Sequence, residues 1–184
     1  VVDGLPWADL DTLGLRLVPP RGARGPAGQV AEAVRALTGL DPLPSHKGPA
    51  DDWPTASAVA VVLDITRGAV SNAHQKARDH WGGAAELVGV VPELVGALVE
   101  LGGVAGVSEL TAPLLDVRPT GLDGDAASRL AAAVVRAAIE AAGDGVPDGV
   151  FAVRRLGRRT IVAVDGGAVE AHIAAGHRAF AGWG

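Results

Sequence analysis

Apolar residues recur at helical spacing along most of the chain. Near the N-terminus four of them follow at steps of three or four residues, which predicts a helix with one buried face; they are Trp7, Leu10, Leu13 and Leu17. A second helix is predicted from Pro26 to Thr38, because Pro favours the first turn of a helix and a Gly, here Gly39, often follows its end. The proline-rich residues 40–52 then predict a loop.

The stretch PTASAVAVVLDITRGAVSNAHQKAR, residues 54–78, predicts two short helices joined by a tight turn. A helix-turn-helix needs a small residue where the helices cross, and Ala60 supplies it. Its turn usually holds Gly; this chain has Asp64, which adopts left-handed backbone more readily than most residues. Thr66 is suited to cap the second helix. The buried stripe of that helix is predicted to be Val70, Ala73, Ala77 and Trp81.

The pattern changes towards the C-terminus. A helix that kinks or restarts at Pro92, a short helix capped by Ser108 and a long alanine-rich helix, residues 125–142, come first. The segments VFAVRR and RTIVAVD alternate around the tip RRLGRR, so they predict a hairpin, and the earlier GVAG is a candidate third strand. This order is that of a winged helix. A closing helix is predicted for residues 168–180.

These elements predict a mainly α fold. We divide the chain near residue 82, into a helical domain with the helix-turn-helix, residues 1–82, and a winged-helix module with a small β-hairpin wing, residues 83–184. Hydrophobic residues make up 48% of the chain, so it should fold, and aromatic residues only 3%. A core of mostly Ala, Val and Leu favours helices.

The polar face of the second helix in 54–78 carries side chains that can read DNA. Amide side chains pair with adenine and guanidinium groups with guanine; the candidates are Arg67, Ser71, Asn72 and Gln75. Lys76 and Arg78, nearer the end of the helix, suit phosphates. His74 is expected on the surface of the same helix. The alternative interpretation is a helical hairpin of the core with an ordinary polar face.

Arginines cluster on the predicted wing. Wings commonly lie along the backbone or minor groove of DNA, and Arg suits both; the residues are Arg154, Arg155, Arg158 and Arg159. A solvated hairpin tip is the alternative. The long helix before the wing offers Ser128, Arg129 and Arg136 but is otherwise alanine-rich. Its few polar groups favour a phosphate clamp or a protein-docking surface over base reading.

The net charge of −5 at first argues against a nucleic-acid partner. Residues 1–82 hold 8 Lys and Arg against 9 Asp and Glu, and residues 83–184 hold 8 against 12. Within residues 66–78, however, there are three cations and no acid. Because salt screens charges over about 10 Å at 0.1 M, a local patch counts for more than the sum. With so few cations, the DNA affinity of the helix-turn-helix alone should nevertheless be weak.

The sequence lacks the residues that several classes of function require. The absence of Cys excludes disulfides and thiolate chemistry, no segment is apolar enough for a membrane span, and a cytoplasmic location is the default. The acidic start is no signal peptide, and the missing initiator Met indicates a piece of a longer protein. The five histidines form no metal-ligand pattern, and Asp51–Asp52 is expected to be a solvated turn. With no nucleophile–base set or phosphate loop, we predict no enzyme activity and no cofactor.

Two long stretches resemble a known family. WPTASAVAVVLDITRGAVSNAHQKARDHW, followed by LVGALVELGGVAGVSELTAPLL, is similar to the C-terminal region of the large serine/threonine kinases of bacterial phage-growth-limitation (BREX-type) defence systems. The first stretch also resembles the promoter-reading helix-turn-helix of sigma factors. That resemblance implies duplex DNA contact at Arg67, Ser71, Asn72 and Gln75, although Asp64 departs from the usual turn. The kinase domain would lie outside this chain.

Two functions are therefore carried forward. The first is a DNA-binding regulatory module of a phage-defence kinase, with the helix-turn-helix in the groove and the wing on the backbone. The second is an interaction module that docks another defence-system protein or the kinase itself, favoured by the smooth long helix and the acidic second half. The sequence leaves open whether the protein forms a homodimer.

Overall fold

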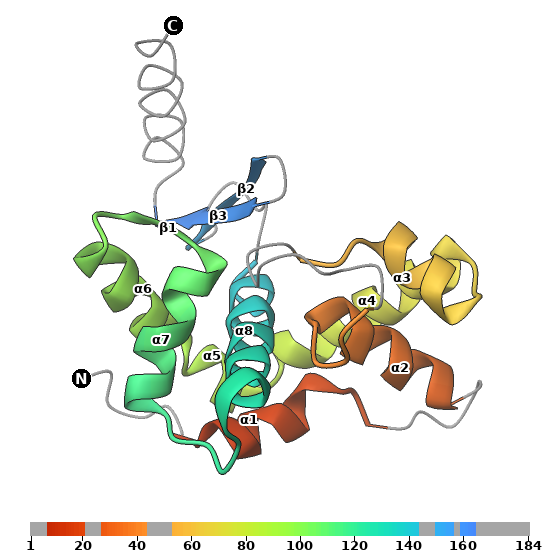
Figure 1. Cartoon of the computed structure of the whole chain (residues 1–184), viewed down its shortest axis with the longest axis horizontal. Helices are drawn as coiled ribbons and strands as arrows, with labels where there is room; N and C mark the ends of the chain where they lie inside the picture. Colours follow the sequence, from red (N-terminus) through yellow and green to blue (C-terminus); the bar gives the residue numbers. More distant parts are fainter. Residues whose placement is uncertain (1–6, 21–26, 44–52, 144–149, 157–158, 165–184) are drawn as a thin grey trace, which may run out of the picture.

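The computed structural model describes residues 7–20, 27–43, 53–143, 150–156 and 159–164, and it is mainly helical with a small three-stranded antiparallel sheet near the C-terminus (Figure 1). The helices are α1 Leu10–Leu17, α2 Ala27–Thr38, α3 Ala56–Leu63, α4 Arg67–Gly82, α5 Ala85–Val88, α6 Val91–Glu100, α7 Val107–Val117 and α8 Gly124–Ala141. The strands are β1 Val104–Gly106, β2 Ala152–Leu156 and β3 Arg159–Ala163. The mainly helical class predicted from the sequence is confirmed.

Helix α8 stands at the centre of the fold, with α6 and α7 on one side and α2 and α3 on the other (Figure 1). It packs against α7, α1 and α4, and every residue from Ala133 to Glu140 is buried. Its alanines make this possible, because small side chains let several neighbours approach closely. The main hydrophobic cluster consequently joins residues from both sides of residue 82, Leu13 and Trp81 with Leu87 and Val134 among them. The division of the chain at residue 82 stays a prediction.

Helices α2, α3 and α4 pack together around a second, smaller cluster. Its buried members are Ala36, Leu37, Leu43, Val59, Ala60 and Val70. The turn between α3 and α4 has the predicted geometry, since Asp64 is left-handed with φ of 52° and ψ of 46°. The Thr66 side chain caps α4 by accepting a hydrogen bond from the backbone N–H of Ala69 at 3.1 Å. Both local predictions are confirmed.

The sheet has the strand order β1-β3-β2, with both pairs antiparallel. The hairpin β2–β3 was predicted, and the GVAG segment does supply the third strand, with Ala105 opposite Val162. Strand β3 is in the middle of the sheet, and its residues from Thr160 to Ala163 are buried. Contacts of β3 with α7 fix the hairpin to the helical body.

Two expectations at element ends turned out differently. Trp7 lies before α1 and is 62% exposed, so it is no part of the buried stripe that holds Leu10, Leu13 and Leu17. Ser108 is not the cap of α7; the helix begins one residue earlier, and the Glu109 carboxylate accepts from the Gly106 N–H at 2.7 Å. β1 ends at Gly106, so the chain passes from strand to helix without a serine cap. Pro92 does mark a helix restart, at the start of α6.

The predicted helix 168–180 and the pair Asp51–Asp52 lie outside the described residues. Within the described ranges, no single helix is long and apolar enough to cross a membrane. Helix α4 and residues 85–100 together have the length and apolar composition of a membrane span, but the two segments are bent by 77° relative to each other. Inside the fold that pair supplies core residues, including Trp81 and Leu94.

Candidate nucleic-acid interface

Helix α4 has one buried side and one solvent side. The predicted buried stripe of Val70, Ala73, Ala77 and Trp81 is confirmed. Lys76, the predicted phosphate contact, is exposed. So are all four candidate base-reading residues, Arg67, Ser71, Asn72 and Gln75. Exposure leaves these side chains accessible to a large partner, and their contact with DNA stays a prediction.

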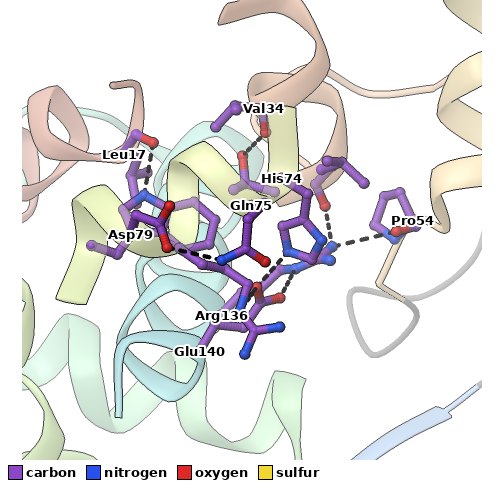
Figure 2. Close-up of polar contacts among 12 residues, drawn as sticks. Leu17, Val34, Pro54, His74, Gln75, Asp79, Arg136 and Glu140 are labelled. Carbon is purple, nitrogen blue, oxygen red and sulfur yellow. Dashed lines mark hydrogen bonds and ion pairs between the residues drawn. The ribbon is translucent and has the colours of Figure 1, made fainter. Parts of the chain in front are cut away.

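The C-terminal end of α4 is anchored by a buried indole. Trp81 is fully buried, and its Nε1–H donates to the backbone carbonyl of Leu17 at 2.8 Å (Figure 2). This bond ties α4 to the end of α1, 64 residues earlier in the chain. A buried Trp whose N–H is satisfied holds a helix in one orientation, because losing the bond would leave a polar group unpaired. The exposed face of α4 therefore has a fixed direction.

An acid sits on the same exposed face. The side-chain amide of Gln75 donates to Oδ1 of Asp79 at 2.8 Å, one helical turn further on (Figure 2). Asp79 is the first residue after the cationic window of residues 66–78. Its carboxylate lowers the local positive potential and occupies one donor of Gln75. The strongest base-reading candidates are therefore in the first half of the helix, where Arg67, Ser71 and Asn72 lie.

A polar cluster that was not predicted from the sequence joins α4 to α8 (Figure 2). Nε2 of His74 lies 2.5 Å from Oε2 of Glu140, whose other oxygen accepts from Nε of Arg136 at 2.8 Å. Nε of Arg78 is 4.0 Å from the same Glu140 oxygen that meets His74. Because the side chain of His74 is 25% exposed and bonded to a buried acid, the expectation that it is a surface residue is wrong.

Arg136 is buried too, so the expectation that it is one of the few polar groups on the surface of the long helix is wrong. It is 5% exposed, and its Nη1 donates to the backbone carbonyls of Leu37 and, at 3.4 Å, Pro54. Its guanidinium carbon lies 5.0 Å from the ring centroid of Trp53. The guanidinium thus links α8 to the end of α2 and to the segment entering α3. These contacts position the helix pair α3–α4 on α8.

The charges in this cluster set the ionisation of Glu140. Burial alone would raise the pKa of its carboxyl, but the nearby Arg136 guanidinium and the His74 imidazole outweigh burial and lower the pKa from 4.5 to about 2. Glu140 is therefore ionised in the folded protein at neutral pH. A sequence signal for this site did exist, since an Arg and a Glu four residues apart in an alanine-rich helix make a pair that can be buried.

The hairpin carries the second group of candidates. Arg154, Arg155 and Arg159 are exposed, whereas Arg158 lies outside the described residues. Nη1 of Arg154 donates to the Val153 carbonyl at 2.9 Å, and Nη2 of Arg159 lies 3.9 Å from the Glu109 carboxylate. Figure 1 shows the hairpin beyond the C-terminal end of α8, the end at which Glu140 meets α4.

Arg78 occupies an intermediate position. Its side chain is 37% exposed, and its guanidinium is close to Glu140 as described above. A phosphate would have to compete with that carboxylate for the same cation. Arg78 thus differs from Lys76, which is exposed on the solvent side of α4.

Among the described residues, no group of three or more His, Asp and Glu side chains could hold a metal ion. Of the five histidines, only His74 and His80 fall within the described ranges. The comparisons with family models, curated proteins and solved structures gave no match for this chain.

Proposed function

We propose that this protein is a DNA-binding module in which α3 and α4 form a helix-turn-helix and α4 enters the major groove. The proposal is carried by one observation: Arg67, Ser71 and Asn72 are exposed on α4, outside its buried stripe. At about 1.5 Å per residue, the 16 residues of α4 extend roughly 24 Å. With its side chains an α-helix is about 10–12 Å across, so it fits the major groove, which is about 12 Å wide.

The later elements support the finer assignment to a winged helix. The order α6–β1–α7–α8–β2–β3, with β3 between β1 and β2, suits a helical unit that ends in a hairpin wing. In such a unit the last helix ordinarily reads bases. Here α8 is buried by α1, α4 and α7, and its exposed residues are at its first turns. Base reading is therefore assigned to α4, and the second unit contributes its hairpin arginines to the backbone.

The resemblance to phage-defence kinases supplies the proposed setting. In that setting the module is a cytoplasmic regulatory part of a larger serine/threonine kinase, and duplex DNA is its partner. The helix-turn-helix offers few cations, so affinity depends on the hairpin as well. Docking of another defence-system protein remains the alternative, but the smooth face of α8 that favoured it is covered by the protein's own helices.

The test is a titration of labelled duplex DNA over a range of salt concentrations, monitored by fluorescence anisotropy. We expect log affinity to fall linearly with log salt, with a negative slope of several units. Replacing Asn72 with Ala, and Gln75 with Ala, should reduce preference among sequences, whereas replacing Arg154 and Arg155 with Ala should weaken all sequences alike. Arg16→Ala is the matched control, because Arg16 is a half-exposed arginine of α1, a helix at the opposite end of α8 from the hairpin (Figure 1). Absence of binding even at low salt would refute the proposal.

A further inference from the structure

Helices α6 and α7 leave an apolar hollow between them, on the far side of α8 from α2 and α3 (Figure 1). Its volume is about 190 Å³, and residues of both helices line it. Gly96 and Ala97 come from α6, and Pro113 and Val117 from α7. Val117 is 53% exposed, so apolar surface at this site is left uncovered by the described part of the chain.

Gly96 makes the hollow accessible to a neighbouring backbone. A β-carbon added at Gly96 would meet no atom within 4 Å, so the space above it is open. Glycine inside a helix is unfavourable by about 1 kcal/mol relative to Ala, and no contact inside the fold requires it here. An approaching helix from outside would find a close-contact position at Gly96.

The rim of the hollow carries one carboxylate that is open to a cation. Residues 83–117, which span α5, α6, β1 and α7, contain five Asp and Glu and no Lys, Arg or His. Arginines outside this segment pair with three of these acids, Arg16 with Glu86, Arg118 with Glu93 and Arg159 with Glu109. Of the two acids that line the hollow, Glu93 is therefore paired, whereas Glu100 is exposed and has no ion-pair partner in the described part of the fold. Glu100 is thus available to a cation of a partner.

We infer that the α6–α7 hollow is a docking site for an amphipathic helix of a partner protein, with an apolar stripe flanked by Lys and Arg. Apolar side chains of that helix enter the hollow beside Gly96, and its cations approach Glu100 and the neighbouring acids. Charge complementarity selects this occupant over an acidic or purely apolar one. The inference does not rest on the proposed DNA contact, because none of the residues proposed to contact DNA lines the hollow.

The experiment uses fluorescein-labelled peptides of about 18 residues, five helical turns, titrated with the full chain. The first peptide repeats Leu and Lys at helical spacing; the second has the same composition in an order without helical periodicity; the third replaces Lys with Glu. We expect the first to bind at least about tenfold more tightly than either of the others. Equal binding of the first two peptides would overturn the inference, because it would show attraction by charge alone.

Two variants locate the site. Gly96→Leu adds a side chain at the hollow, at a position where a β-carbon meets no atom within 4 Å, and Glu100→Lys reverses the charge at the rim. Each should weaken binding of the first peptide at least about tenfold. Glu32→Lys, on the exposed side of α2 at the other end of the molecule, makes the same charge change and should leave binding unaltered. Circular dichroism confirms that each variant folds.

Sedimentation of the unlabelled chain tests the competing occupant. If the wild type forms a dimer that Gly96→Leu converts to a monomer, the hollow is filled by a second copy and the inference is wrong. If the peptide binds equally to Gly96→Leu and wild type, the site lies elsewhere and the inference is also wrong. A failure of DNA binding has no bearing on either result, because no DNA is present in these measurements.

Discussion

The imidazole of His74 and the carboxylate of Glu140 meet at 2.5 Å, although 66 residues separate them in the sequence. His74 belongs to α4, the helix that also carries the candidate base-reading residues, and Glu140 to the central helix α8. This contact, together with the buried guanidinium of Arg136, holds α4 on the helical body. The orientation of the candidate interface therefore depends on a polar cluster that touches no ligand.

Replacing Glu140 with Gln should destabilise the protein strongly. The substitution leaves Arg136 buried without its counter-charge, and breaking a buried ion pair on one side typically costs about 3–5 kcal/mol. The free energy of unfolding in urea, measured at pH 7, gives the value. A loss under about 1 kcal/mol would mean that the cluster is far better solvated than its burial indicates.

The same carboxylate predicts a specific loss of stability in acid. The pKa of Glu140 is about 2 in the folded protein, below the ordinary 4.5. A lowered pKa means that the stabilisation is complete above about pH 4.5 and is lost as the pH falls towards 2, with a total of about 3 kcal/mol. Urea unfolding at pH 6, 4 and 3 measures it. Other acids contribute as well, so the difference between wild type and Glu140→Gln isolates this group; a constant difference across the pH range would contradict the prediction.

Replacing the buried Arg118 should lower the free energy of unfolding far more than replacing Arg16, although both arginines pair with a glutamate. Arg118 is 1% exposed, and besides its two bonds to Glu93 it donates to the backbone carbonyl of Ala8 at 2.5 Å. Replacing it with Ala should cost about 3 kcal/mol, because it opens a cavity and leaves partners unpaired. Arg16 is the control: it pairs with Glu86 at 3.0 Å on the surface, and Arg16→Ala should cost under about 1 kcal/mol. Thermal unfolding of both variants decides the comparison.

The turn between α3 and α4 predicts opposite effects of two substitutions. Asp64 has a φ of 52°, which Gly adopts freely and a β-branched residue adopts only with strain. Asp64→Gly should change stability by at most about 1 kcal/mol, because relief of strain offsets the greater freedom of the unfolded chain. Asp64→Val should lower it by more than about 1 kcal/mol. Similar melting temperatures for the two variants would show that the turn can change its conformation.

Two helical glycines should respond differently to alanine. At Gly96 the added β-carbon meets nothing, so Gly96→Ala should stabilise the protein by about 0.5–1 kcal/mol through helix propensity. At Gly14 the added β-carbon would be 2.9 Å from a terminal methyl of Leu130, a core residue of α8. Gly14→Ala should therefore be less stable than Gly96→Ala by about 1 kcal/mol or more. Differential scanning calorimetry of the two variants provides the measurement.

Features set by near neighbours in the chain were predictable from the sequence. The left-handed Asp64, the Thr66 cap, the restart at Pro92 and the β2–β3 hairpin all depend on residues a few positions apart. The failures depend on contacts between distant residues. Nothing in the local sequence of His74 reveals that Glu140 lies beside it, and the pattern around Trp7 reads as helix although α1 begins three residues later.

The candidate site divides in the same way. Helical periodicity correctly placed Ser71, Asn72 and Gln75 on the open side of α4, because the buried stripe was visible in the sequence. The partial neutralisation of Arg78 was not visible, since its carboxylate partner comes from another helix. Burial of Arg136 and Glu140 depends on α8 being enclosed, which composition alone does not reveal.

The enclosure of α8 has a consequence for how a duplex would be accommodated. The hairpin is fixed to α7, α7 packs on α8, and α8 packs on α4, so the spacing between helix face and wing is built into the fold. A duplex that meets both surfaces has to match this spacing. Wherever the match requires bending, flexible pyrimidine–purine steps lower its energy, so the stiffness of the double helix would add selectivity to contacts with base edges.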